Sequence, residues 1–277
     1  MRLGGPIFKS YSNPQEWAAR QRELGFTAVY FPCDSAADKY EIRSYQQETE
    51  KNGFVIAEVG AWSNPLSKNQ AEAEKALAYC QNQLALADEI GARCCVNIAG
   101  SLGDTWDGPH PDSFSQEAFE RVVTTVRQII DAVSPKRTFY ALELMPWMFP
   151  DSPDSNLRLI EAVDRRSFAV HLDPVNIICS PRAYYNNGDV IRECFEKLGP
   201  YIKSCHAKDI LLEPGLTTHL SERRIGEGTL DYKAYLTCLN LLDKDTPIML
   251  EHLSSHEDVV FSAGNIRKYA ATEGICL

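Results

Sequence analysis

Short apolar segments alternate with longer amphipathic segments along the whole chain. The short segments are rich in Val, Ile, Phe and Tyr, which are residues that favour β-strands. We expect strands at residues 6–8, 27–32, 54–62, 94–100, 138–146, 168–173, 202–209 and 247–253.

The amphipathic segments between these strands predict helices. The helix expected at 13–25 has the clearest boundaries, because Asn13 is a suitable N-cap, Pro14 takes the first helical position and Gly25 follows the last turn. Further helices are expected at 69–91, 113–135, 155–164, 189–200 and 231–244.

Strands and helices that alternate in this way are typical of a parallel sheet. Eight such strands predict an α/β protein that closes into a (β/α)8 TIM barrel. The alternative is an open doubly wound sheet, but no G-x-G-x-x-G segment or P-loop follows any of the strands. No repeat or flexible linker divides the chain, so we expect a single domain over residues 1–277.

Composition adds mainly exclusions. The 277 residues carry a formal net charge of −10 with a pI of about 5.1, and Lys and Arg are scattered, which argues against a nucleic-acid partner. No apolar run is long enough to cross a bilayer, so no membrane partner is expected. Nine cysteines without a C-x-x-C pair indicate a reducing compartment. Since no signal-peptide pattern stands at the N-terminus, we expect a cytoplasmic location.

The last four expected strands each carry one ionisable residue near the C-terminal end. These residues are Glu143, Asp173, His206 and Glu251, and they lie 30, 33 and 45 residues apart. A βα unit of such a barrel takes about thirty residues. Residues two apart in a strand share a face, so Glu143 goes with Ala141, whereas His252 is expected on the face opposite to Glu251.

Three carboxylates and an imidazole that converge on one barrel mouth would repel one another without a cation. A divalent metal makes the arrangement favourable, and mixed oxygen and nitrogen ligands suit Mn²⁺ first, with Mg²⁺, Co²⁺ or Zn²⁺ as alternatives. Any one of the four could instead be an ordinary surface or ion-paired residue. Their matching positions on four successive strands favour the metal site.

Around these positions the sequence resembles the xylose isomerase-like TIM-barrel superfamily of sugar isomerases and epimerases. The resemblance is carried by LELMPW, HLDPVN, HAKD, RIGEGTLDY and MLEH. It implies that Glu143, Asp173, His206 and Glu251 bind the metal, and that the two glutamates act as an acid/base pair on a ketose or related keto-polyol through a cis-enediolate. It also implies a homodimer or homotetramer.

Two alternatives to this isomerase or epimerase stay open. One is a metal-dependent dehydratase, a lyase of a keto-polyol such as an inosose. The other is a non-catalytic sugar-binding barrel. A nuclease of the endonuclease IV type would need additional zinc-binding histidines, and the chain has only six histidines.

Further candidates lie beside these motifs. Epimerases commonly have a histidine where this chain has Asn176, which we assign to substrate binding. Lys208 shares the face of His206 and could hold a hydroxyl, carboxylate or phosphate group or donate a proton; the alternative is an ion pair with Asp209 or Glu213.

The remaining substrate-binding candidates lie at strand ends and in loops. Trp62 could stack on a sugar or pack at the rim, and Asn97 could reach a hydroxyl or bond a loop. Arg224 could bind an anionic group or lie in a solvated loop. The full set of expected substrate contacts is Glu58, Trp62, Asn97, Trp147, Asn176 and Arg224.

Overall fold

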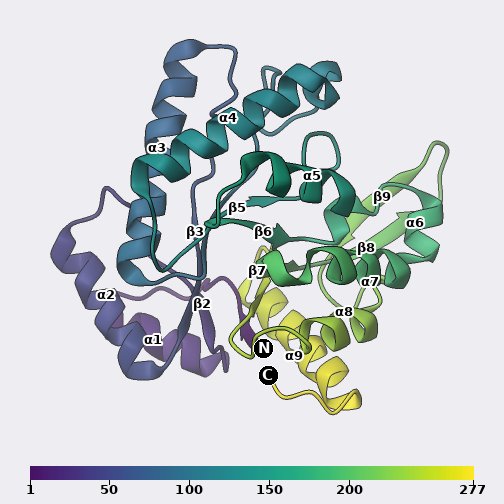
Figure 1. The fold of residues 1–277 in the computed structure, drawn as a ribbon. Coiled ribbons are helices and arrows are strands. Elements are labelled where there is room, and N and C mark those ends of the chain that lie inside the picture. The colour runs from purple at the N-terminus through teal and green to yellow at the C-terminus, as the bar shows by residue number, and fades with distance from the viewer.

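The computed structural model describes residues 1–277 as an eight-stranded parallel barrel surrounded by helices (Figure 1). The hydrogen-bonded strand order is β1-β10-β7-β6-β5-β4-β3-β2. The ring closes between β2 and β1, where the Thr27 N–H donates to the Leu3 carbonyl at 2.9 Å. The barrel strands are β1 (Arg2–Gly4), β2 (Ala28–Tyr30), β3 (Val55–Gly60), β4 (Cys94–Asn97), β5 (Tyr140–Glu143), β6 (Phe168–Leu172), β7 (Ile202–Ala207) and β10 (Pro247–Leu250).

The helices lie on the outside of the ring and follow the strands in sequence (Figure 1). Asn13 caps the first helix as expected, since its side chain accepts from the Glu16 N–H, and Pro14 occupies the first helical position. The helices are α1 (Pro14–Glu23), α2 (Lys39–Asn52), α3 (Gln70–Ile90), α4 (Gln116–Val133), α5 (Pro153–Val163), α6 (Pro181–Tyr185), α7 (Asn187–Leu198), α8 (Tyr232–Leu239) and α9 (His256–Thr272). None of them is both long and apolar enough to cross a membrane.

Two large clusters of apolar side chains pack between the strands and the helices, whereas only small clusters lie inside the ring. Small groups of buried residues, among them Ala141, Ala169 and Met249, pack in the two interior clusters. Ala141 was expected to share the face of Glu143 because strand residues alternate. Apolar side chains thus fill the inside of the barrel, and the polar residues lie at the carboxyl ends of the strands.

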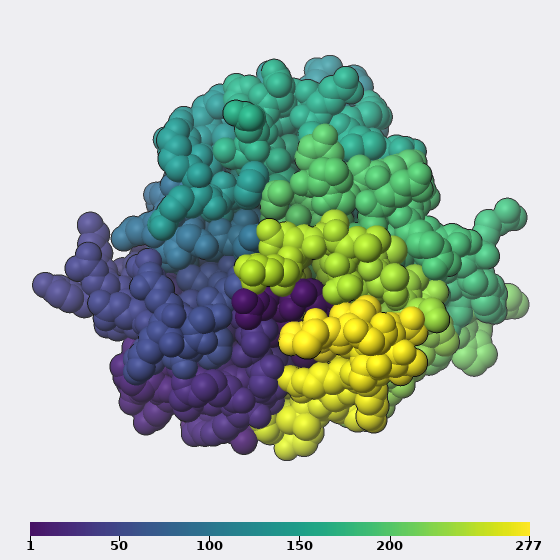
Figure 2. All heavy atoms as spheres, turned by 60° about the horizontal axis from the view of Figure 1, so that its bottom comes forward, coloured from purple at the N-terminus to yellow at the C-terminus, as the bar shows by residue number.

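The two ends of the chain meet in the same part of the barrel. β1 pairs in parallel with β10, and the guanidinium of Arg267 on α9 donates to the Leu24 carbonyl after α1. In Figure 2 the purple N-terminal residues accordingly lie beside the yellow C-terminal segment. The last strand–helix unit therefore completes the ring started by the first strand.

The strand expected at 6–8 is wrong, because the first strand is β1 at residues 2–4. Pro6 has no N–H to donate to a ladder. Gly4, in contrast, suits a crowded barrel strand, since a Cβ there would lie 2.3 Å from the Ala28 carbonyl oxygen. This segment can pack because Gly4 has no side chain. For the same reason, Gly4 adds nothing to the hydrophobic pattern that predicts strands.

Four elements were not expected from the sequence. Three are the helices α2, α6 and α9, and α2 buries only Ile42, Tyr45, Glu48 and Thr49 of its fourteen residues. The fourth is an antiparallel hairpin between β7 and α8, formed by β8 (Asp209–Glu213) and β9 (His219–Arg223). Figure 1 shows it at the right, outside the ring of barrel strands.

Candidate functional site

The four residues predicted as metal ligands converge at the carboxyl ends of the barrel strands. Glu143 ends β5, Asp173 follows β6, His206 lies in β7 and Glu251 follows β10. Their ligand atoms all lie within 4.8 Å of one another. Asp173 is fully buried, and Glu251 keeps 15% of its side chain exposed.

Direct contacts join three of the four residues around the His206 imidazole, and Asp173 lies within 4.8 Å of them. His206 Nδ1 lies 3.1 Å from Glu143 Oε1 and 3.0 Å from Glu251 Oε1. Asp173 Oδ1 accepts the Val175 N–H, but Asp173 Oδ2 has no hydrogen-bond partner. The carboxylates of Glu143 and Glu251 therefore face one imidazole nitrogen, and the Asp173 carboxylate lies nearby.

Lys208 supplies a positive charge to this cluster. Its Nζ lies 2.9 Å from Asp173 Oδ2, at angles unsuited to a hydrogen bond, and 3.0 Å from Glu251 Oε2. The ion-pair partners expected for Lys208 were wrong. Asp209 accepts backbone N–H groups instead, and Glu213 pairs with Arg223 within the hairpin.

Burial and mutual contact shift the pKa values in this cluster. Burial raises the pKa of Asp173 to about 6, and the nearby carboxylates of Glu251 and Glu143 add to this rise against the opposing charge of Lys208. Burial alone would lower the pKa of Lys208, but Asp173, Glu251 and Glu222 raise it above its ordinary value. The pKa of Glu251 is lowered because His206 and Lys208 outweigh its burial.

These residues fit a divalent cation. Three carboxylates and one imidazole are a suitable donor set. Asp173 Oδ2 is buried beside Lys208 Nζ but accepts no hydrogen bond, so it has a lone pair to offer a cation. Three carboxylates are costly to bury together unless they are paired or coordinated. The donor set leaves the identity of the ion open among Mn²⁺, Mg²⁺, Co²⁺ and Zn²⁺.

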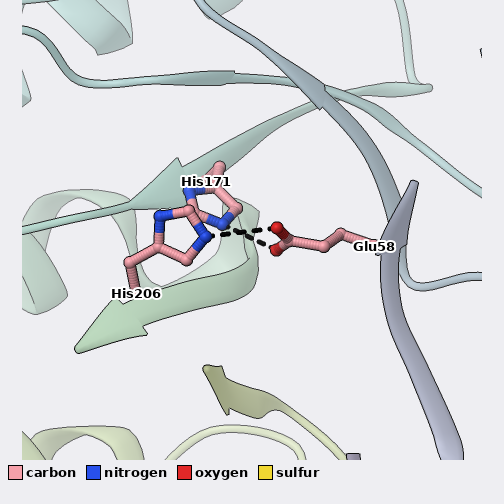
Figure 3. A group of neighbouring side chains, drawn as sticks. All are labelled: Glu58, His171 and His206. Atoms are coloured by element: carbon pink, nitrogen blue, oxygen red, sulfur yellow. Dashed lines mark hydrogen bonds and ion pairs between the residues drawn. The ribbon is translucent and has the colours of Figure 1, made fainter. Parts of the chain in front are cut away.

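His206 also belongs to a second group of buried polar residues, with Glu58 and His171 (Figure 3). Glu58 Oε2 lies 2.9 Å from His171 Nε2 and accepts from Ser204 Oγ at 2.9 Å, while Glu58 Oε1 lies 3.1 Å from His206 Nε2. Burial would raise the pKa of Glu58, but the two imidazoles lower it below its usual range. His206 thus presents Nε2 to Glu58 and Nδ1 to the acidic cluster.

A cavity of about 1040 Å³ opens above these groups. Eight of the expected site residues line it, and they are Glu58, Trp62, Glu143, Trp147, Asn176, His206, Lys208 and Glu251. Asn176 Nδ2 donates to Glu143 Oε1 at 3.3 Å and to the Leu144 carbonyl at 3.1 Å. It therefore holds Glu143 in place as well as facing the cavity.

Asn97 and Arg224 need correction, because neither lines the cavity. The Asn97 side chain is fully buried and bonds the backbone of Ser63 in both directions, which is the loop-bonding alternative. Arg224 pairs with Glu227 and Asp258 and lies over the ring of Phe261. Both side chains are thus engaged in local structure.

His252 and Glu222 line the cavity although the sequence did not predict them as site residues. His252 was expected on the opposite face, but it lies beyond the end of β10 with φ at 51°, where strand alternation no longer applies. Glu222 on β9 reaches the cavity and pairs with His252 Nδ1 at 2.7 Å and Lys208 Nζ at 2.9 Å. Only the path of the unexpected hairpin brings Glu222 here, and no motif marks it.

A sequence model of the family described as xylose isomerase-like TIM barrel matches residues 18–271. A 3-dehydroshikimate dehydratase of Bacillus anthracis is 25% identical over 140 residues, which cover 50% of this chain and 45% of that protein. The match thus spans less than half of that relative's length.

Two solved structures show the shared fold. D-psicose 3-epimerase of Clostridium cellulolyticum H10, crystallised with D-tagatose, has a TM-score of 0.72 at 13% identity, with 100% of each chain covered. A xylose isomerase-like TIM-barrel protein of Mycobacterium smegmatis in complex with magnesium has a TM-score of 0.67 at 18% identity, with 94% of this chain and 89% of that chain covered.

Proposed function

The chain belongs to the xylose isomerase-like TIM barrel family, and from this premise we propose that it is a divalent-metal-dependent isomerase or epimerase of a ketose or related keto-polyol. The observation that carries the proposal is the convergence of Glu143, Asp173, His206 and Glu251 below one cavity. Members of this family that resemble the chain include a D-psicose 3-epimerase and a 3-dehydroshikimate dehydratase.

A bound divalent cation would polarise a ketose carbonyl and its neighbouring hydroxyl, and so acidify the C–H bond between them. Glu143 and Glu251 then serve as the acid/base pair. They come from β5 and β10, which are separated by β6 and β7 in the barrel, so their carboxylates enter from different strands. One removes the proton to give a cis-enediolate, and the other returns a proton from the opposite face.

Lys208 and Asn176 have supporting parts in this proposal. The Lys208 ammonium lies against Glu251 and lines the cavity, where it can stabilise negative charge on the substrate or donate a proton. Its pKa is raised by the surrounding carboxylates against the effect of burial, so it stays protonated near neutral pH. Asn176 keeps the Glu143 carboxylate oriented.

A dehydratase is the second candidate, and the match to 3-dehydroshikimate dehydratase favours it. Removal of water from a keto-polyol starts with the same proton abstraction next to a carbonyl. Lys208 is then placed to protonate the departing hydroxide. The two candidate reactions therefore share the first step and diverge at the second.

Solvent-exchange experiments test the proposal. We expect the metal-loaded protein to incorporate deuterium from D₂O into one or more ketoses of a panel, read by mass spectrometry. Glu143→Gln and Glu251→Gln should each lower the exchange rate by at least about 10²-fold, the lower end of a general acid–base contribution. The exposed Glu161 on α5 offers a matched control, and Glu161→Gln should exchange at the wild-type rate. Full exchange in either active-site variant would contradict the two-base scheme, whereas a product lacking water would identify the dehydratase.

A further inference from the structure

The cavity is divided into an ionic half and an aromatic half. The ionic half is formed from β7, β9 and β10 by His206, Lys208, Glu222, Glu251 and His252. The aromatic half consists of Trp62, Trp106 and Trp147, which follow β3, β4 and β5, together with Phe31 after β2. The proposed acid/base chemistry uses Glu251 of the ionic half together with Glu143 at the end of β5, and it gives the tryptophans no part in proton transfer.

The tryptophans are exposed yet held in place. Trp62 and Trp106 are each 41% exposed, and Trp147 is 37% exposed. Trp147 Nε1 donates to the Asp107 carbonyl at 2.7 Å, which ties the loop of Trp106 to the loop after β5. Exposed apolar groups gathered at one mouth mark a binding surface rather than random exposure.

Trp62 is positioned by the backbone beneath it. A Cβ at Gly60 would lie 2.4 Å from Trp62 Nε1, so the indole reaches its place only because residue 60 has no side chain. Neither Trp62 nor Trp106 uses its indole N–H in a hydrogen bond within the chain, and both can therefore bond a ligand. An indole with a free N–H offers an apolar face and a polar edge together.

The size of the cavity sets the scale of the ligand. Its volume of about 1040 Å³ lies just above the roughly 300–1,000 Å³ typical of pockets that enclose drug-sized ligands. A monosaccharide held at Glu143 and Glu251 would therefore fill only part of the cavity. The aromatic half needs a second group with a flat, partly apolar face.

We infer that the substrate has two parts, a keto-polyol head at the ionic half and a second ring that stacks on Trp62 and Trp106. The face of a sugar ring and the face of an aryl ring both suit an indole, so the substrate class is a sugar linked to another sugar or to an aryl group. The assignment of the head rests on the proposed function. The assignment of the second ring rests on the tryptophans and the cavity volume.

Calorimetric titration of the full-length, metal-loaded protein with two matched pairs of compounds tests this inference. One pair is D-fructose and the galactosyl-fructose disaccharide lactulose, and the other is methyl and phenyl 3-keto-β-D-glucopyranoside, so that every compound carries a keto-polyol head. We expect the two-ring member of at least one pair to bind at least tenfold more tightly than its one-ring partner. The pair that shows the difference identifies the second ring as a sugar or as an aryl group.

Variants of the aromatic half locate the binding. Trp106→Ala should remove the tenfold preference while the affinity for the one-ring partner changes less than twofold, and Trp106→Phe should retain part of the preference. Tyr40→Ala is the control, since Tyr40 is an aromatic residue that is 82% exposed and outside the cavity. Melting temperatures of the variants confirm that the fold is kept.

The inference is overturned if neither two-ring compound binds more tightly, or if the preference survives Trp106→Ala and Trp62→Ala together. The outcome is separable from that of the proposed function, because binding is measured without turnover. A two-ring preference without deuterium exchange in any ketose would leave the inference standing and refute the enolisation. Deuterium exchange without a two-ring preference would support the enolisation and refute the inference about the second ring.

Discussion

Glu58 shows how one buried carboxylate sets the orientation of a proposed metal ligand. It contacts Nε2 of both His171 and His206, so only Nδ1 of His206 faces the acidic cluster. Partners of this kind fix the tautomer and the ring orientation of ligating histidines, and their loss typically lowers metal affinity about 10–100-fold. The carboxylate therefore acts through His206 as a positioning residue.

Glu58→Gln tests this role, because the amide keeps the size of the side chain but can accept through one oxygen only. We expect the dissociation constant for Mn²⁺ to rise about 10–100-fold, measured by calorimetry on the folded variant. Glu161→Gln again serves as the control. An unchanged constant would mean that the orientation of His206 does not depend on Glu58.

At this scale, the sequence predicts residues at strand ends better than residues in loops. The positions of Glu143, Asp173, His206 and Glu251 follow from strand boundaries and motifs, and the structure brings them together. His252 lies one residue beyond Glu251, where the alternation of a strand no longer applies. Arg224 is held away from the cavity by local ion pairs. Such partners depend on loop paths that no period in the sequence encodes.

Among the elements, the turn after the β8–β9 hairpin is where the HAKD and RIGEGTLDY segments contact each other. The Asp209 carboxylate, which is 1% exposed, accepts the N–H groups of Gly226 and Gly228 at Oδ2, and those of Ile210 and Leu230 at Oδ1. A Cβ at Gly228 would lie 2.3 Å from Asp209 Oδ1. One buried carboxylate thus organises the return of the chain from the hairpin to α8.

Asp209→Ala should leave those buried N–H groups without an acceptor. Since an unsatisfied buried donor costs about 1–3 kcal/mol, we expect the free energy of unfolding to fall by at least ~3 kcal/mol, measured by urea denaturation. Asp209→Asn keeps one acceptor oxygen and should lose clearly less. A loss below ~0.5 kcal/mol for the alanine variant, the range of ordinary surface substitutions, would show that the turn does not depend on this carboxylate.

Among the side chains of the hairpin, Glu222 makes the ionic contacts with residues at the barrel mouth. Glu222 pairs with Lys208 and His252, while its own side chain is 45% exposed. Exposed pairs contribute about 0–1 kcal/mol, so Glu222→Gln should leave global stability nearly unchanged but speed amide hydrogen exchange in β8 and β9. Identical exchange in the two proteins would show that other contacts hold the hairpin over the cavity.

For the whole molecule, the alternation of strands and helices is enough to predict the barrel, because each βα unit forms from local signals that repeat. The errors fall where tertiary packing outweighs those signals. β1 forms from three residues because β10 flanks it and β2 lies on its other side, and α2 covers the barrel with a largely polar sequence. A hydrophobic period cannot identify elements whose stability comes mainly from their neighbours.

A metal ion at the mouth should stabilise the entire barrel, because its proposed ligands come from four strands that are distant in sequence. A ligand that binds only the folded state stabilises it by about 2.7 kcal/mol at a hundred times its dissociation constant. For a chain of this size, we expect saturating Mn²⁺ or Mg²⁺ to raise the melting temperature by at least about 5 °C, and excess EDTA to reverse the rise. Asp173→Asn should abolish the response to metal, since it removes a buried ligand charge, whereas the surface variant Glu161→Gln should retain it. A melting temperature that does not change with Mn²⁺, Mg²⁺, Co²⁺ or Zn²⁺ would mean that Lys208 and His206 balance the carboxylates without a metal, and the proposed metal-dependent chemistry would then fail.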